Sequence, residues 1–456
     1  MKNIGWLSNL KIRASWGQIG NNRITDKDGY QDYYGYQATY KTYNYSFGGA
    51  QAAALAQNRI GNSRLEWEST TVTNFGVDAG FLNNRLTAEL DVYNKVTDGI
   101  LTTPNLHLTM GIKTPPTMNT AEVTNRGFEL TVGWKDHVGD FNYAVSTNFS
   151  YNHNEVTKYL GKYEAGWVEK DGKKVWQSNI GDVSVDKDKG RIVEGHPIKE
   201  YYTLNTYSGN GTHFNSDGSV NINGGPKDGM IRTEGDMKWL NAMIDAGYKF
   251  MPNQSVGRNN IYYGDLIYAD LNGDGIYGSS YDYDFQGSSA MPKFGYGINI
   301  SASWKNFDLS MLWAGNGGFK LYWEEDPYNS VAIRNGFATS ERVANDHYFY
   351  DPENPTDSRT NLNGYIPRLV ENSKQSRQTS NYYLYNGTYM KLKNLTIGYT
   401  LPVTLTEKIS AERVRVYLSG ENLFTITSFP GQDPEMGATT NYPSLRQFAA
   451  GISVTF

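Results

Sequence analysis

Apolar and polar residues alternate strictly in many short segments of this chain. From Phe141 to Tyr151 every second residue is aromatic, Val or Thr, and the residues between them are Asn, Ala and Ser. The run from Phe294 to Trp304 has the same pattern, with Gly, Asn and Ser as the small or polar set. A period of two places successive side chains on opposite faces of a β-strand. These runs therefore predict strands with one apolar face and one polar face.

Ten segments have this strand signal, and two further features indicate where they lie. The two clearest runs are close to the roughly 9–11 residues that a tilted strand needs to cross a bilayer. Aromatic residues lie near both ends of these runs, as the interfacial girdles of a membrane barrel require. The final segment ends in an aromatic residue, Phe456. The predicted strands are 10–17, 66–80, 86–97, 127–135, 141–152, 294–304, 307–314, 389–401, 413–421 and 444–456.

The connections between these segments alternate between short and long. A bacterial outer-membrane barrel has short periplasmic turns and longer extracellular loops, whereas a soluble sandwich has no reason to sort its loops in this way. We therefore predict an all-β fold, a transmembrane antiparallel β-barrel, with large extracellular regions at 153–293 and 315–388. Further strands are expected near Tyr201–Tyr207 and Gly264–Asp270. The short connections follow 66–80, 127–135, 294–304 and 389–401.

The composition narrows the class without contradicting a barrel. The net charge of −5 argues against a nucleic-acid partner. The absence of cysteine excludes disulfides and thiolate metal sites. A mean hydropathy of −0.59 is low, but a barrel strand is apolar only at alternate positions and polar loops dilute the average. No apolar segment of a signal peptide follows Met1.

One motif indicates a ligand. The segment from Asp270 to Ile276 matches the opening of a calcium loop, with oxygen side chains at its first, third and fifth positions and a Gly for the sharp turn. Tyr281 takes the position of the closing Glu, so Asp282 or Asp284 would have to serve in its place. The alternative is an Asx- and Gly-rich turn without metal. The predicted ligands of a structural Ca²⁺ are Asp270, Asn272, Asp274, Ile276 and Asp282.

Aromatic residues flank a Gly-rich stretch at 315–318. One interpretation is a loop that presents aromatic faces to a sugar or peptide, and the other is a girdle residue followed by an ordinary loop. The predicted substrate-binding residues are Trp313, Phe319, Tyr322 and Trp323. The sequence contains no His-Glu-x-x-His, Gly-x-Ser-x-Gly or phosphate-loop motif. We therefore predict that the protein is not an enzyme and needs no cofactor.

Taken together and in order, several segments resemble the carboxy-terminal half of the SusC/RagA family of TonB-dependent outer-membrane transporters. The similarity runs along the whole chain. The segments that carry it are Leu10–Asn21, Thr124–Leu130, Gly264–Leu266 with Asp270–Gly275, Tyr389–Tyr399 with Leu401-Pro402, Ser419–Phe424, Asp433-Pro434-Glu435, Tyr442-Pro443 and the terminal Phe456.

This resemblance implies a plugged barrel of about 22 strands in the bacterial outer membrane, of which the chain would supply the last ten or so. It also implies uptake of oligosaccharides or peptides with a SusD-like surface lipoprotein, driven by TonB through a plug domain and TonB box. The cargo class stays open at this point. The alternative class is a soluble or surface β-sandwich that binds glycans.

The chain departs from the family pattern in what it lacks. We find no signal peptide, TonB box, plug domain or first half of the barrel in these 456 residues. A half barrel would leave unpaired strand edges at membrane depth, where no water satisfies the backbone. We therefore expect a fragment, a truncated reading frame or one piece of a split barrel that needs the missing amino-terminal part. Expressed alone, it should not form a heat-modifiable barrel.

Overall fold

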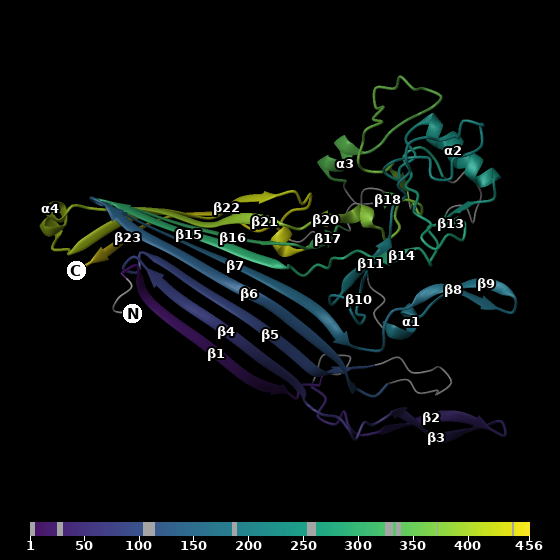
Figure 1. Cartoon of the computed structure of the whole chain (residues 1–456), viewed down its shortest axis with the longest axis horizontal. Coiled ribbons are helices and arrows are strands. Elements are labelled where there is room, and N and C mark those ends of the chain that lie inside the picture. The colour runs from purple at the N-terminus through teal and green to yellow at the C-terminus, as the bar shows by residue number, and fades with distance from the viewer. Residues whose placement is uncertain are drawn as a thin grey trace.

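The computed structural model describes residues 5–24, 31–103, 115–184, 189–252, 261–323, 332–333, 339–371, 373–439 and 442–456. Its main feature is one antiparallel sheet of ten strands (Figure 1). In sheet order the strands are β1 (Leu7–Asn21), β4 (Glu68–Phe81), β5 (Leu86–Thr102), β6 (Met118–Val138), β7 (Phe141–Lys158), β15 (Phe294–Trp304), β16 (Phe307–Gly317), β21 (Tyr389–Thr400), β22 (Arg413–Thr427) and β23 (Gln447–Thr455).

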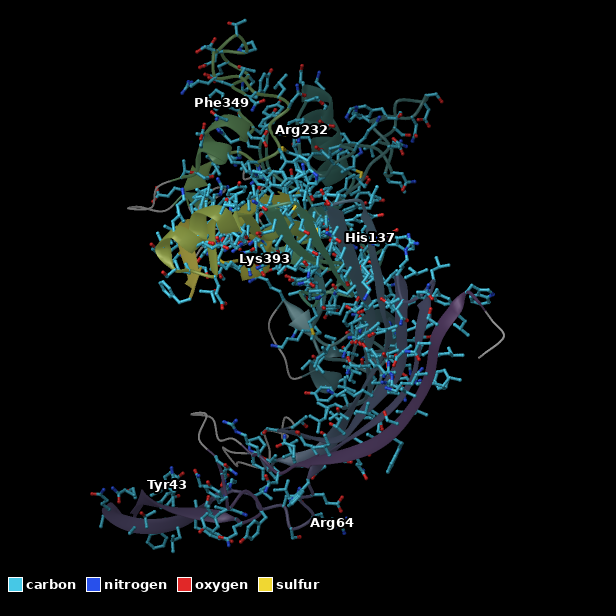
Figure 2. All side chains as sticks on the ribbon, turned by 90° about the vertical axis from the view of Figure 1, so that its left-hand side faces the viewer. Tyr43, Arg64, His137, Arg232, Phe349 and Lys393 are labelled. Carbon is cyan, nitrogen blue, oxygen red and sulfur yellow. The ribbon has the colours of Figure 1, made fainter. Side chains whose placement is uncertain are left out.

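All ten predicted strands are confirmed, and several are longer than their sequence signal. β6 begins at Met118, nine residues before the predicted start at 127. Viewed from the end where the chain begins and ends, the sheet forms an open arc (Figure 2). Its outermost strands are β1 and β23, which do not pair with each other. The arrangement is therefore part of a barrel wall.

The alternative of a β-sandwich is wrong. A sandwich needs two large sheets packed face to face. The other sheets in the described residues have only two or three strands.

The connections are sorted as the sequence predicts. Figure 1 places the short turns, with both chain termini, at one end of the sheet and the long loops at the other. All four short connections contain left-handed backbone, among them Asn83 and Asn84 (φ 59° and 60°) and Gly139 (φ 59°). Asn and Gly tolerate this conformation, which suits a tight connection between antiparallel strands.

The strand register gathers the apolar residues on one face. Ile300 of β15 lies opposite Val145 of β7 and Met311 of β16. Ser301, the next residue, lies opposite Ala144 and Ser310 on the other face. The apolar face stays open in the structure, as a surface turned to lipid would be. Its exposed members include Ile12, Phe75, Leu90, Val92, Ile397, Val416, Leu418 and Ile452.

The hydrophobic core of the protein lies in the loops and not in the sheet. The long connections after β7 and β16 pack together around buried residues such as Trp239, Met230 and Tyr383. The predicted strand near 201–207 is β11 (Glu200–Leu204). The segment 264–270 forms only isolated bridges, at Leu266 and Tyr268. Figure 1 shows this loop layer beyond the long-loop end of the sheet.

The loop layer also contains α2 (Glu234–Asp245), which the strand-based interpretation did not predict. Thr233 and Asp236 form a capping box at its start. No helix of the described residues is long and apolar enough to cross a membrane. The remaining strands and α-helices of the described residues are β2 (Thr39–Phe47), β3 (Ala50–Arg59), β8 (Ala165–Lys170), β9 (Lys173–Ser178), α1 (Ile180–Val183), β10 (Gly190–Arg191), β12 (Lys249–Phe250), β13 (Ile276–Tyr277), β14 (Tyr283–Phe285), β17 (Lys320–Tyr322), β18 (Ala332–Ile333), α3 (Glu341–Asp346), β19 (Val370–Glu371), β20 (Leu384–Asn386) and α4 (Val403–Thr406).

Candidate functional site

The polar face of the sheet carries a network of compensated charges. The Arg13 guanidinium on β1 donates to Asp78 on β4 (2.6 Å) and, across one more strand, to Asp91 on β5 (2.7 and 2.9 Å). Asn74 adds a fourth member by donating to Asp91 at 2.9 Å. Arg13 follows Ile12 in β1, so its side chain lies on the face opposite the apolar one, here called the concave face because it lines the inside of the arc. The concave face is therefore a polar wall whose charges are paired along the sheet.

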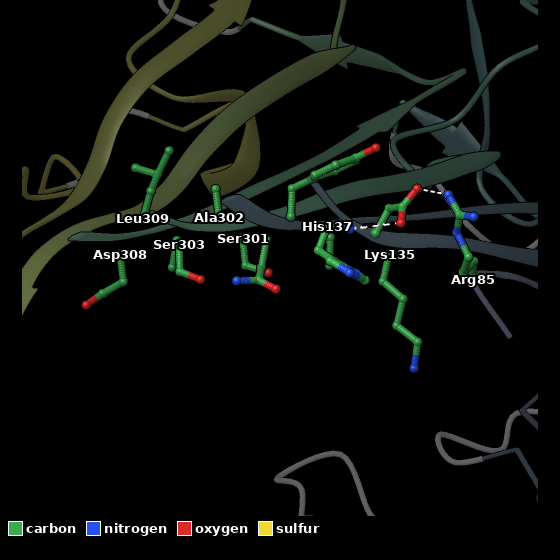
Figure 3. A pocket seen from close by; sticks show the side chains of 13 residues that line it. Arg85, Lys135, His137, Ser301, Ala302, Ser303, Asp308 and Leu309 are labelled. Carbon is green, nitrogen blue, oxygen red and sulfur yellow. Dashed lines mark hydrogen bonds and ion pairs between the residues drawn. The ribbon is translucent and has the colours of Figure 1, made fainter. Parts of the chain in front are cut away.

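A cavity of about 740 Å³ opens on this face near the short-turn end (Figure 3). Lys135, Ser301, Ser303 and Asp308 belong to its lining. Asp308 also accepts hydrogen bonds from Arg415 of β22, with a distance of 2.9 Å to Nε. Hydroxyl, amide and charged groups along a wall can exchange hydrogen bonds with a hydrated solute. The concave face can therefore form hydrogen bonds with a polar molecule that moves along it.

A second charged cluster ties the loop after β22 to the sheet. The Lys391 ammonium on β21 is 1% exposed and lies 2.6 Å from Asp433 and 2.8 Å from Glu435. Ser444 donates to Asp433 at 2.6 Å, and Lys393 pairs with Glu435. Burial raises the pKa of the Asp433 carboxyl, but the hydrogen bonds from Lys391 and Ser444 outweigh it and leave the pKa below its usual value. The carboxylate is therefore held ionised beside the buried lysine.

Sequence reasoning missed this cluster as a site. The segments around Lys391 and Asp433 both stand out in the sequence, but 41 residues lie between them, and no periodicity links a strand to a distant loop. The pairing depends on the tertiary fold, and the one available signal was a lysine at a position of β21 whose neighbours are largely apolar.

The predicted substrate-binding aromatics do not form one exposed surface. Phe319, Tyr322 and Trp323 are buried, with exposed fractions of 8% or less. Phe319 and Trp323 pack with Tyr389 in a small core between the sheet and the loop layer. Trp313 lies opposite Ile298, on the apolar face of the sheet. Substrate binding by these four residues stays a prediction, and their positions match the alternative of a girdle residue followed by a packed loop.

The predicted calcium loop is an ordered turn in the loop layer. Asp270 accepts backbone N–H groups from Gly273 (2.7 Å) and Gly275 (2.8 Å). Asp274 accepts the N–H of Ile276 at 2.8 Å, and the N–H of Asp274 donates to Asn272 at 3.1 Å. These bonds are typical of an Asx turn, in which side-chain oxygens accept backbone N–H groups of the same segment.

Asp282, the fifth predicted ligand, is buried and closes the same turn. Its two oxygens accept the N–H groups of Leu271 (2.9 Å) and Ser279 (2.7 Å). Burial raises the pKa of Asp282 above its usual value. No group of three or more His, Asp or Glu side chains is placed to hold a metal ion in the part of the chain that the structure describes. Calcium at this turn stays a prediction.

Comparison with known proteins places this geometry in a family. Residues 3–250 match the family described as TonB dependent receptor-like, beta-barrel. The chain is 25% identical to the TonB-dependent receptor SusC of Bacteroides thetaiotaomicron, over all of this chain and 38% of that protein. It is 26% identical to the TonB-dependent receptor P3 of Formosa agariphila, over all of this chain and 40% of that protein. The chain therefore spans well under half the length of these relatives.

Solved structures share the fold. The chain superposes on a structure described as the RagAB peptide transporter with a TM-score of 0.67 and 22% identity, over all of this chain and 42% of that one. The RagAB peptide importer in its open-open state gives a TM-score of 0.65 at 22% identity, over all of this chain and 41% of that one. The open ten-stranded arc corresponds to part of the wall of such barrels.

Proposed function

We propose, because this chain belongs to the TonB-dependent receptor-like β-barrel family, that it supplies part of the wall and the extracellular loops of an outer-membrane importer. The observation that carries the proposal is the two-faced sheet. Its apolar face suits lipid and its concave face is a polar, charge-paired wall. The protein is an outer-membrane β-barrel protein related to SusC and RagA.

The transported molecule in this proposal is an oligosaccharide or a peptide, taken up with a SusD-like surface lipoprotein and with energy from TonB. SusC-like relatives and the RagAB peptide transporter support this choice by similarity. Transport also fits the chemistry of the concave face, which offers hydroxyl, amide and charged groups. We propose a transport role and no catalytic role, since the relatives are named as receptors.

Uptake by the producing cells tests the proposal. Deleting the gene that encodes this chain should abolish growth on at least one oligosaccharide or peptide mixture, while growth on the corresponding monomers continues. The full-length protein should be recovered in the outer-membrane fraction, and a surface lipoprotein should copurify with it. Unchanged growth on every oligomer that the parent strain uses would contradict the proposal.

A further inference from the structure

The β8–β9 hairpin lies on the long-loop side of the protein (Figure 1) and lines a second cavity. This cavity has a volume of about 680 Å³, which is within the range of small-molecule sites. It lies outside the sheet and is separate from the concave face. Its lining residues include Glu164, Val168, Val175, Trp176, Asp182 and Tyr281.

The hairpin that builds the cavity is held in place. Asp171 and Gly172 form its two-residue turn with left-handed backbone (φ 53° and 72°), as Asp-Gly turns do. Trp167 donates its indole N–H to the carbonyl of Asn272 at 2.9 Å, which fixes the hairpin to the neighbouring turn. The side-chain amide of Asn179 donates to the carbonyl of Lys162 (3.0 Å) and accepts the N–H of Glu164 (2.8 Å). The cavity therefore has walls of defined geometry.

Polar groups of the cavity are available to a ligand. The side chains of Glu164, Gln177 and Asp182 are exposed, and the structure gives none of them a hydrogen bond to another described residue. Asn179 differs, because its amide is already used within the hairpin. Carboxylate and amide oxygens accept hydrogen bonds from hydroxyl groups, and the amide of Gln177 can donate one in return.

The rest of the lining is apolar and aromatic. Val168 and Val175 lie opposite each other on one face of the hairpin. The Trp176 ring packs on Trp167 at the opposite face of the hairpin, and Tyr281, 49% exposed, is the aromatic side chain of the lining. A sugar ring presents the matching combination, with C–H faces that lie on apolar and aromatic groups and hydroxyls around its edge. None of the lining residues that the structure describes is Lys or Arg, so these walls present no cation to an acidic group.

We propose that this cavity is an extracellular subsite for a neutral oligosaccharide, with Glu164, Gln177 and Asp182 as hydrogen-bonding residues and Tyr281 as an aromatic wall. The inference deepens the proposed function and rests on it for the cargo class. It concerns capture at the cell surface, before a molecule reaches the concave face. A basic peptide is the competing occupant, because carboxylates and aromatic rings also attract cations.

Binding to the full-length protein, purified in detergent from outer membranes, tests the subsite. The probe is an array of neutral oligosaccharides of four to eight units, followed by titration of those that bind. Glu164→Gln and Asp182→Asn should each weaken binding about tenfold, since each replaces a charged hydrogen-bond acceptor by a neutral one. Both side chains are exposed, so the variants keep the fold. Glu169→Gln, an exposed carboxylate of the same hairpin outside the cavity, should leave affinity unchanged.

Three results would overturn the subsite. In the first, the parent protein binds no neutral oligosaccharide. In the second, the two cavity variants bind with the same affinity as the parent. In the third, the protein binds only Lys- and Arg-containing peptides, and the affinity falls as the salt concentration is raised. Uptake separates this test from the proposed function. If the cavity binds sugar but gene deletion leaves uptake intact, the subsite stands and the importer role fails. If gene deletion stops uptake and the two cavity variants bind sugar with the parent's affinity, the importer role stands and the subsite fails.

Discussion

The sheet and the loop layer bury apolar residues in opposite ways. On the sheet, Leu418 is 64% exposed and Ile452 is 69% exposed, although both lie in regular strands. In the loop layer, Trp239, Met230 and Ile231 are completely buried. The sheet turns its apolar residues outward to lipid, and the loops turn theirs inward away from water. One chain therefore buries its apolar residues by two different rules.

The largest effect should come from the core of the loop layer. Trp239 packs against Tyr207, with ring centroids 5.2 Å apart, and donates to the carbonyl of Asn221 at 2.7 Å. Trp239→Ala should cost about 3–5 kcal/mol, because it leaves a cavity and an unpaired carbonyl. Hydrogen exchange should show the loop layer opening while the strands stay protected. Trp304→Ala, at a half-exposed position of the sheet, is the control. If Trp239→Ala reduced protection from hydrogen exchange equally in loops and strands, the loop layer and the sheet would not be stabilised independently.

The junction between the two regions depends on the buried Lys391. Asp433→Asn should destabilise the loop after β22 by roughly 3 kcal/mol, because removing one member of a buried ion pair leaves an unbalanced charge. The remaining Glu435 limits the loss. Thermal unfolding of the full-length protein, with protease digestion of this loop as the readout, measures the effect. Glu234→Gln, a carboxylate in an exposed surface pair with Lys238, should change little.

The same carboxylate predicts a pH dependence with a definite sign. The folded pKa of Asp433 is lowered, so its contribution to stability is present above the unfolded value of about 4 and is lost as the pH falls through the folded pKa. The stability difference between the parent and Asp433→Asn should therefore be constant at neutral pH and shrink under acid conditions. A difference that stays constant down to pH 2 would contradict the ionised state of Asp433.

The sequence predicts the sheet far better than the loops, for a physical reason. Strand alternation is local, so Phe141–Tyr151 or Phe294–Trp304 can be recognised without knowing any partner. The loop core joins residues such as Tyr207, Trp239 and Tyr383, which no period connects. The Lys391–Asp433 pair fails for the same reason. Among the predicted site residues, the aromatics were identified by type alone, and type does not distinguish a ring that waits for a ligand from one that fills a core.

Two neighbouring residues of β15 test whether the apolar face of the sheet is turned to lipid and the polar face to the inside of the arc. Ile300 lies on the apolar face at the middle of β15, and Ser301 lies on the concave face. Ile300→Lys should cost about 2–3 kcal/mol in a bilayer, whereas Ser301→Lys should be nearly neutral because the concave face is polar. Assembly of the full-length protein into the outer membrane, followed by urea unfolding in liposomes, compares the two. Equal costs at both positions would refute the assignment of the faces.

The smallest expected effect concerns the Asp270 turn, which belongs to neither core. Its carboxylates accept backbone N–H groups, so they already have partners without a metal ion. Asp270→Ala should therefore lower the stability of the loop layer by about 1–2 kcal/mol even in EDTA, because it leaves the N–H groups of Gly273 and Gly275 unpaired. Asp217→Ala, in an exposed turn where Asp217 accepts a similar hydrogen bond from the N–H of Ser219, is the matched control for loss of a turn carboxylate in water.

Adding calcium then separates the two interpretations of the Asp270 motif, a metal site and a turn without metal. A calcium-dependent rise in unfolding temperature that the parent shows and Asp270→Ala lacks would establish a metal site, since an ion bound only to the folded state stabilises it by mass action. An identical response of both proteins would leave the turn held by its own backbone alone.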